Sequence, residues 1–161
     1  MALVDLSKQV ALGIDIGGTN TKYGFVNHRG EILEKGSIKT NDYEKVEDFI
    51  DALYEKITPM MEKHCTQKQF DGIGVGAPNA NYYTGTIEQA PNLRWKGIVP
   101  FAELMSKKFG IPCKMTNDAN AAALGEMMFG AARGMKDFIM MTLGTGVGSG
   151  IISGGQLIYG H

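Results

Sequence analysis

The chain has few cysteines, the residues whose disulfides stabilise many small extracellular domains. It contains only two cysteines, Cys65 and Cys113, which form no Cys-x-x-Cys pair and have no paired histidines nearby. This pattern indicates neither a disulfide framework nor a zinc site. We therefore expect the protein to be cytoplasmic.

The chain also lacks a targeting signal and a long hydrophobic run. Residues 1–10 contain an acidic residue, Asp5, and no basic segment ahead of an apolar run, unlike a secretory signal peptide. No apolar stretch in the sequence reaches the roughly 20 residues that a membrane helix needs. We therefore expect no membrane partner.

Charge of neither sign dominates, because 16 Lys and Arg residues oppose 17 Asp and Glu residues, for a formal net charge of −1. This balance excludes the basic surface with which proteins bind nucleic acids or anionic membranes. The 161 residues, 43% hydrophobic and 20% charged, suit a folded globular chain. Glycine is in excess, with 22 residues, roughly twice the usual share.

Hydrophobic periodicity predicts three strands, a helix, a strand, a helix, a strand and a helix, in that order. Strands are expected at residues 10–16, 22–26, 31–38, 71–78 and 112–116. Helices are expected at 42–63 with a kink or early stop at Pro59, at 100–110 with Pro100 as the first helical residue, and at 118–129. Residues 79–97 are expected to be irregular. This order predicts an α/β fold of the ribonuclease-H-like type, with helices on a mixed sheet.

Residues 14–33 and 141–158 share one pattern: strand, glycine-rich hairpin, strand, turn, strand. Because the same strand pattern begins again near residue 137, we expect two similar lobes. We expect an N-terminal lobe at 1–117, an inter-lobe helix region at 118–136 and an incomplete second lobe at 137–161. The chain is therefore expected to be truncated and inactive by itself.

Two glycine-rich hairpins are predicted to bind phosphate. A hairpin turn can gather backbone N–H groups into an anion nest, which needs glycine where φ is positive or where a phosphate comes close. The Asp15 carboxylate beside the first hairpin could hold Mg²⁺ through water. Neither hairpin has the spacing of a Walker A loop or a dinucleotide site, and tight hairpins without a ligand are the alternative. The residues predicted to bind the nucleotide are Asp15, Gly17, Gly18, Thr19, Asn20, Gly144, Thr145, Gly146 and Gly148.

Asn117 and Asp118 are expected where a strand ends and a helix begins. In open α/β sheets, ligand groups gather at the carboxyl ends of strands. A carboxylate placed there can take the proton of an attacking hydroxyl, and the neighbouring amide can orient the molecule that carries it. The alternative is that Asp118 serves only as the helix N-cap.

Five segments, in this order, resemble the ROK family of sugar kinases, most often bacterial glucokinases. They are Asp15-Ile-Gly-Gly-Thr19, Gly74-Val-Gly-Ala-Pro78, Ala90-Pro-Asn-Leu-Arg-Trp95, Asn117-Asp-Ala-Asn-Ala-Ala-Ala-Leu-Gly-Glu126 and Leu143-Gly-Thr-Gly-Val-Gly-Ser-Gly150. The resemblance implies a two-lobed, actin-like ATPase fold and transfer of the ATP γ-phosphate to a hexose hydroxyl. The resemblance implies glucose as the first candidate substrate and its O6 hydroxyl as the phosphate acceptor.

By this resemblance Asp118 is the catalytic base, and the sugar is bound by Asn117, Pro78, Asn79 and Gly146. ATP and Mg²⁺ are the implied cofactors, and the full-length protein is expected to form a homo-oligomer. The family's zinc loop and its sugar-binding Glu and His would follow residue 161, so zinc is expected only in the full-length protein. Asn79 and Ala80 depart from the family, because many members have glycine there.

Two other functions stay open. Some ROK members are transcriptional repressors, which carry a helix-turn-helix domain before the first glycine loop; here only 14 residues precede Asp15, which argues against it. A non-catalytic sugar or nucleotide sensor is the second alternative, and the presence of Asp118 argues against that. Tyr82, Tyr83 and Trp95 are expected either to border the sugar cleft or to pack within their loop.

Overall fold

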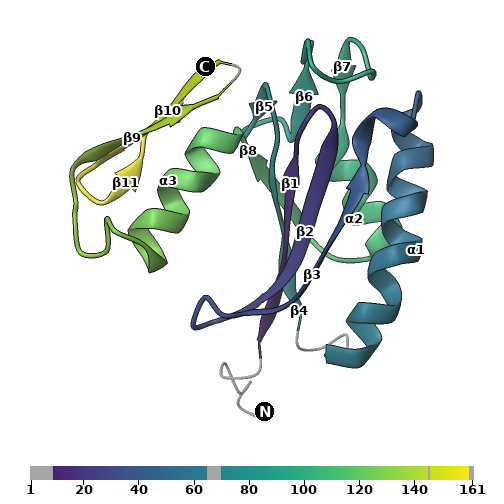
Figure 1. Cartoon of the computed structure of the whole chain (residues 1–161), viewed down its shortest axis with the longest axis horizontal. Helices are drawn as coiled ribbons and strands as arrows, with labels where there is room; N and C mark the ends of the chain where they lie inside the picture. The colour runs from purple at the N-terminus through teal and green to yellow at the C-terminus, as the bar shows by residue number, and fades with distance from the viewer. Residues whose placement is uncertain (1–8, 65–69, 145, 160–161) are drawn as a thin grey trace.

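The computed structural model describes residues 9–64, 70–144 and 146–159. Its centre is a five-stranded mixed sheet, the main sheet, with strand order β3-β2-β1-β4-β8 (Figure 1). Strands β1 to β3 are antiparallel, whereas β4 runs parallel to both β1 and β8. The bounds are β1 Val10–Ile16, β2 Asn20–Asn27, β3 Ile32–Lys39, β4 Phe70–Gly76 and β8 Cys113–Thr116. The predicted α/β fold with a mixed sheet is confirmed.

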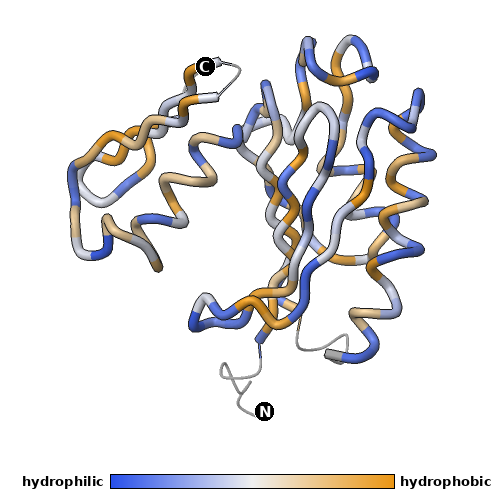
Figure 2. The backbone as a smooth tube through the Cα atoms, viewed as in Figure 1, coloured by the Kyte–Doolittle hydropathy of each residue, from blue (hydrophilic) through white to orange (hydrophobic). Residues whose placement is uncertain are grey.

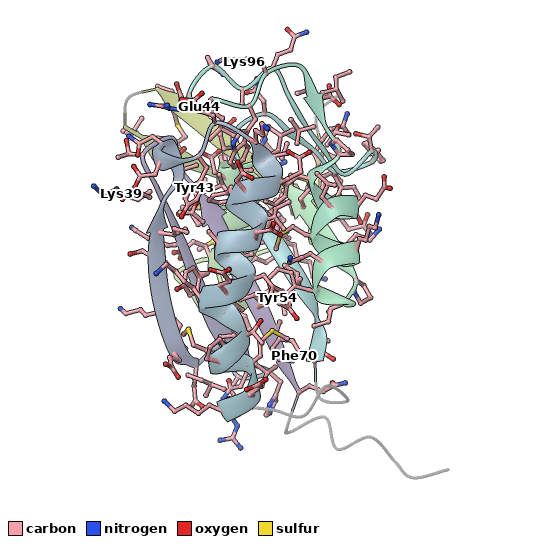
Figure 3. The ribbon with its side chains drawn as sticks, turned by 90° about the vertical axis from the view of Figure 1, so that its right-hand side faces the viewer. Lys39, Tyr43, Glu44, Tyr54, Phe70 and Lys96 are labelled. Carbon is pink, nitrogen blue, oxygen red and sulfur yellow. The ribbon has the colours of Figure 1, made fainter. Side chains whose placement is uncertain are left out.

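Two helices, α1 (Val46–His64) and α2 (Phe101–Phe109), lie side by side over one face of the main sheet. Figure 3 looks onto this face, with Tyr54 labelled on α1. Phe49, Leu53 and Ile57 lie on one stripe of α1 and are fully buried. Each such side chain stabilises the fold by about 1.5–3 kcal/mol. This packing covers one face of the main sheet, whereas α3 contacts β4 and mainly covers the strands β9 and β10.

Two predicted helix starts are wrong, and of the kink or early stop expected at Pro59 the early stop does not occur. The first helix begins at Val46 rather than at residue 42, because Thr40–Asp42 form a separate 3-10 turn. Pro59 does not stop this helix, which continues to His64. Its apolar stripe continues past the proline through Met60 and Met61, which pack against the core and offset the lost backbone hydrogen bond. Pro100 is the N-cap of α2 rather than its first helical residue.

The segment predicted to be irregular contains two short strands, which form with a third strand just after it a three-stranded sheet, the small sheet, in the order β5-β6-β7. Its strands are β5 (Ala80–Asn81), β6 (Thr86–Glu88) and β7 (Ile98–Val99). Ile87 is buried in the core, so Thr86 and Glu88 point to the opposite face. Trp95 is also buried and stacks on Phe101, with ring centroids 6.0 Å apart. Trp95 therefore packs in the core and does not border a cleft.

After β8 the chain forms α3 (Asp118–Phe129) and then β9 (Phe138–Leu143), β10 (Val147–Ser153) and β11 (Gln156–Leu157). The last three strands form an antiparallel sheet, the C-terminal sheet, in the order β11-β10-β9. It repeats the β3-β2-β1 meander of the main sheet. Figure 1 shows α3 between the two sheets. The lobe boundaries proposed at residues 117 and 136 stay a prediction.

The C-terminal sheet packs closely on α3 because small residues face each other. A Cβ atom added to Gly150 would lie 2.6 Å from the Ala123 Cβ and 2.7 Å from the Ala119 carbonyl oxygen. Any side chain at residue 150 would therefore push β10 away from the helix. The opposite face of this sheet exposes Ile139, Met141 and Leu143, and Figure 2 shows the hydrophobic residues along these strands.

No helix in the described ranges is both long enough and apolar enough to cross a membrane.

Candidate functional site

A cleft of about 880 Å³ lies where the main sheet, the small sheet, α3 and the C-terminal sheet meet. The β1–β2 turn, the segment 78–82, the N-terminal end of α3 and the β9–β10 turn supply most of its wall. Residues far apart in the sequence thus share one cavity. The predicted site residues that line it are Gly17, Gly18, Pro78, Asn79, Asn117, Asp118, Gly144, Gly146 and Gly148.

Three predicted residues do not line this cleft, and Thr145 lies outside the described residues. Asp15 instead lines an adjoining hollow of about 610 Å³ on the open face of the main sheet. Its neighbours Ile14 and Ile16 point into the core, so the alternation of the strand turns Asp15 the other way. Thr19 and Asn20 lead into β2, where their carbonyl oxygens accept backbone hydrogen bonds from Thr40 and Gly17.

The first hairpin needs glycine for a reason other than the predicted one. Neither Gly17 nor Gly18 has a positive φ. A Cβ on Gly17 would lie 2.8 Å from the carbonyl oxygen of Asn20, and one on Gly18 would lie 2.8 Å from that of Asn92. The protein's own backbone therefore excludes side chains at both positions. That this turn binds phosphate stays a prediction.

The second hairpin is more open. Its turn is closed by the Gly144 N–H, which donates to the Gly146 carbonyl oxygen at 3.0 Å. Gly144 has no positive φ, and a Cβ on Gly144 or Gly146 would meet no atom of the described residues within 4 Å. At these two positions nothing within the described protein requires glycine, and the missing side chains leave space on the cleft wall.

Asn117, rather than Asp118, caps α3. The Asn117 Oδ1 accepts a hydrogen bond from the Asn120 backbone N–H at 2.7 Å, so the alternative that Asp118 is the N-cap is wrong. The Asn117 side-chain NH₂ donates to no described residue. Asp118 is the first helical residue and is exposed in the cleft, where its Oδ1 accepts from the Ala119 N–H at 2.8 Å. The N-terminal end of a helix favours negative charge at this point.

Asn79, at a position where many family members have glycine, adopts a backbone conformation that is typical of glycine. Asn79 has φ 52, the left-handed conformation that glycine adopts freely and that asparagine tolerates better than most residues. Its Nδ2 donates to the Glu88 carbonyl oxygen at 3.1 Å, and the Glu88 N–H donates to the Asn79 carbonyl oxygen at 3.0 Å. The loop after Pro78 is therefore held in place by β6.

The cleft also contains residues that were not predicted, among them Glu88, Asn92 and Tyr159. Tyr82 lines it as well and stacks on Tyr159, with ring centroids 4.0 Å apart and planes at 19°. Burial, and then the neighbouring Tyr82, raise the pKa of Tyr159 above its ordinary value. No sequence pattern marks Glu88 and Tyr159, because only the tertiary fold brings the small sheet and the segment after β11 to this cleft.

Other reactive side chains lie outside the cleft. Burial raises the pKa of the Cys113 thiol to about 12, and this cysteine faces the core below α2. Within the described ranges, no three His, Cys, Asp or Glu side chains are grouped so that they could hold a metal ion.

Comparison with known proteins identifies the family. The model of the ROK family matches residues 11–161. The glucokinase of Halalkalibacterium halodurans is 36% identical over 160 residues, which cover 96% of this chain and 47% of that protein. The xylose repressor of Caldicellulosiruptor bescii is 33% identical over 162 residues, which cover 98% of this chain and 40% of the repressor.

The fold agrees with these matches. The crystal structure of a ROK family glucokinase from Streptomyces griseus, in complex with glucose and AMPPNP, superposes with a TM-score of 0.81 at 36% identity. The match covers 94% of this chain and 47% of the glucokinase, so the chain spans about half the length of the relatives that it matches. The expected actin-like ATPase fold is confirmed by these neighbours. The chain belongs to the ROK family.

Proposed function

We propose that the full-length protein transfers the γ-phosphate of ATP to a hexose hydroxyl, with glucose O6 as the first candidate. The observation that supports this most is the cleft, which unites the exposed Asp118 carboxylate with two glycine hairpins from distant parts of the chain. The similar Streptomyces griseus glucokinase, in complex with glucose and AMPPNP, supports the choice of both ligands. The activity is assigned to the full-length protein because the chain spans about half the length of its glucokinase relatives.

In this reaction the protein mainly positions the reactants, because phosphoryl transfer needs little covalent chemistry from side chains. Asp118 accepts the proton of the attacking sugar hydroxyl while the bond between the γ-phosphate and ADP breaks. Asn117 donates its side-chain NH₂ to the sugar, beside Pro78 and Asn79. The backbone N–H groups of the hairpins at 17–18 and 144–148 bind the phosphates.

Magnesium fits this arrangement as an ion held mostly by phosphates and water. Asp15 is exposed and its carboxylate accepts no hydrogen bond from a described residue, so it could bind a hydrated ion from the adjoining hollow. When bound, Mg²⁺ would neutralise phosphate charge during the transfer. We further expect the full-length protein to form a homo-oligomer.

A sugar-responsive repressor is the alternative function, and the identity with the xylose repressor supports it. The two functions differ in one measurement, the release of ADP from ATP by the full-length protein with and without added hexose. Glucose, mannose, fructose, allose and N-acetylhexosamines would form the panel. Release that depends on the sugar, without DNA binding, supports the kinase. DNA binding without such release would instead establish the repressor.

A further inference from the structure

Within the described part of the chain, the carboxylate of Glu88 is bound through only one of its two oxygens. Oε1 accepts hydrogen bonds from the Thr86 hydroxyl at 2.8 Å and from the Asn81 Nδ2 at 3.1 Å. The Thr84 hydroxyl lies 3.4 Å from Oε1 and 2.6 Å from the Thr86 hydroxyl. Oε2 accepts no hydrogen bond from any described residue. One oxygen is therefore fixed by the hairpin, and the other is left available.

The backbone that carries this carboxylate is also fixed. Glu88 exchanges hydrogen bonds with Asn79 through its N–H and its carbonyl oxygen. The preceding residue, Ile87, is 1% exposed and anchors β6 in the core from the opposite face. Oε2 is therefore held ready to bind before any ligand arrives, so little side-chain entropy is lost on binding.

The surroundings of Glu88 define the ligand group that could pair with Oε2. Glu88 lines the same cleft as Asn117 and Asp118, and no Lys, Arg or His is among the described residues of that cleft. Among the described residues of the cleft, therefore, no cation faces Glu88, and a nucleotide phosphate would be repelled by its charge. A neutral molecule with many hydroxyls supplies the missing donor.

We propose that Glu88 is a specificity-determining residue that accepts a hydrogen bond through Oε2 from one hydroxyl of the hexose. This inference rests on the proposed sugar kinase function. It predicts that the protein rejects a sugar that lacks this hydroxyl, because the carboxylate would then stay desolvated without a partner. A hydrogen bond to a charged group changes binding by about 10- to 100-fold.

The first test compares two variants of the full-length protein. Glu88→Gln keeps an acceptor for Thr86 and Asn81 but replaces the free acceptor with a donor. The KM for the hexose should rise by about 10- to 100-fold, with little change in the KM for ATP or in kcat. Thr86→Val is the matched control, because it removes a hydrogen bond within the hairpin and leaves Oε2 in place. An equal rise in both variants would mean that Glu88 only stabilises the hairpin, which overturns the inference.

The second test uses sugars that each lack one hydroxyl, with binding measured by calorimetry as well as turnover. One deoxyglucose should bind wild type about 10- to 100-fold more weakly than glucose does, yet bind Glu88→Gln no more weakly than glucose. Equal relative losses in both proteins for every deoxy sugar would refute the role of Glu88. Calorimetry tests the role of Glu88 separately from the proposed function. Sugar binding without sugar-dependent ADP release would refute the kinase activity but not the role of Glu88 in sugar binding.

Discussion

The ring of Tyr82 stacks on the ring of Tyr159, with centroids 4.0 Å apart. Tyr82 belongs to the turn between β5 and β6, whereas Tyr159 follows the C-terminal sheet, so the pair joins the two sides of the cleft. Tyr83 adds an edge contact to Tyr159 at 5.9 Å. Such aromatic pairs contribute about 0.5–1.5 kcal/mol beyond the area they bury. The small sheet and the C-terminal sheet are thus held together at the cleft rim.

This contact should weaken at alkaline pH. Burial, followed by Tyr82 and Tyr83, raises the pKa of Tyr159 above its ordinary value of 10.0. A raised pKa in the folded state stabilises the fold below the unfolded pKa, and this contribution is lost as pH rises through the folded pKa. Urea unfolding at about pH 8 and about pH 11 should therefore show a larger loss for wild type than for Tyr159→Phe, which cannot ionise. An equal loss in both proteins would contradict this assignment.

Replacing Asp118 with Asn should abolish most turnover while the fold is kept. The kcat of the full-length protein should fall by about 10²- to 10⁴-fold, because the proton acceptor is lost. Helix α3 should not change, since its N-cap is Asn117. The thermal midpoint and the sugar affinity serve as controls and should stay near the wild-type values. Near-normal turnover would leave Asp118 with no catalytic role.

The two glycine hairpins should respond differently to substitution. Gly18→Val should destabilise the protein by about 1–3 kcal/mol, because its Cβ would collide with the Asn92 carbonyl oxygen. It should also weaken ATP binding. Gly144→Ala lies in open space and should leave stability within about 0.5 kcal/mol of wild type. Calorimetry with AMPPNP should still show weaker binding, and unchanged affinity in Gly144→Ala would mean that this hairpin does not contact phosphate.

Cys113 should be inert in the folded protein. Its buried thiol has a pKa of about 12, so the reactive thiolate is scarce near neutral pH. Iodoacetamide at about pH 8 should label the Cys113 peptide slowly in native protein and fully in urea, as read by mass spectrometry. Rapid labelling of the native protein would show that α2 opens readily over this residue.

Long periodic elements were predicted well because their own sequence decides them. The strand Val10–Ile16 alternates apolar residues, and the helix Asp118–Phe129 is rich in alanine; the structure has both with the expected bounds. The small sheet was missed because its strands have two or three residues, too few for a period to be recognised. The early stop that local propensity allows at Pro59 does not occur, because burial on both sides of the proline keeps the helix.

The candidate site was predictable only in part. The hairpin glycines and Asn117-Asp118 carry local signals, and the structure brings them into one cleft. The position of Asp15 follows from the alternation of its strand, which points it away from the core and into the adjoining hollow. Glu88 and Tyr159 carry no local signal, because only the tertiary fold places a short sheet and the segment after β11 beside Asp118.

The most direct test of the proposed kinase is to follow the phosphate itself by ³¹P NMR. The full-length protein, ATP, Mg²⁺ and glucose are combined, and the same mixture is prepared with Asp118→Asn. The wild-type protein should convert ATP into ADP and a hexose phosphate in equal amounts, and the variant should form almost none of either. ADP that appears without hexose phosphate, or equal product from both proteins, would contradict the assignment of hexose kinase activity to this cleft.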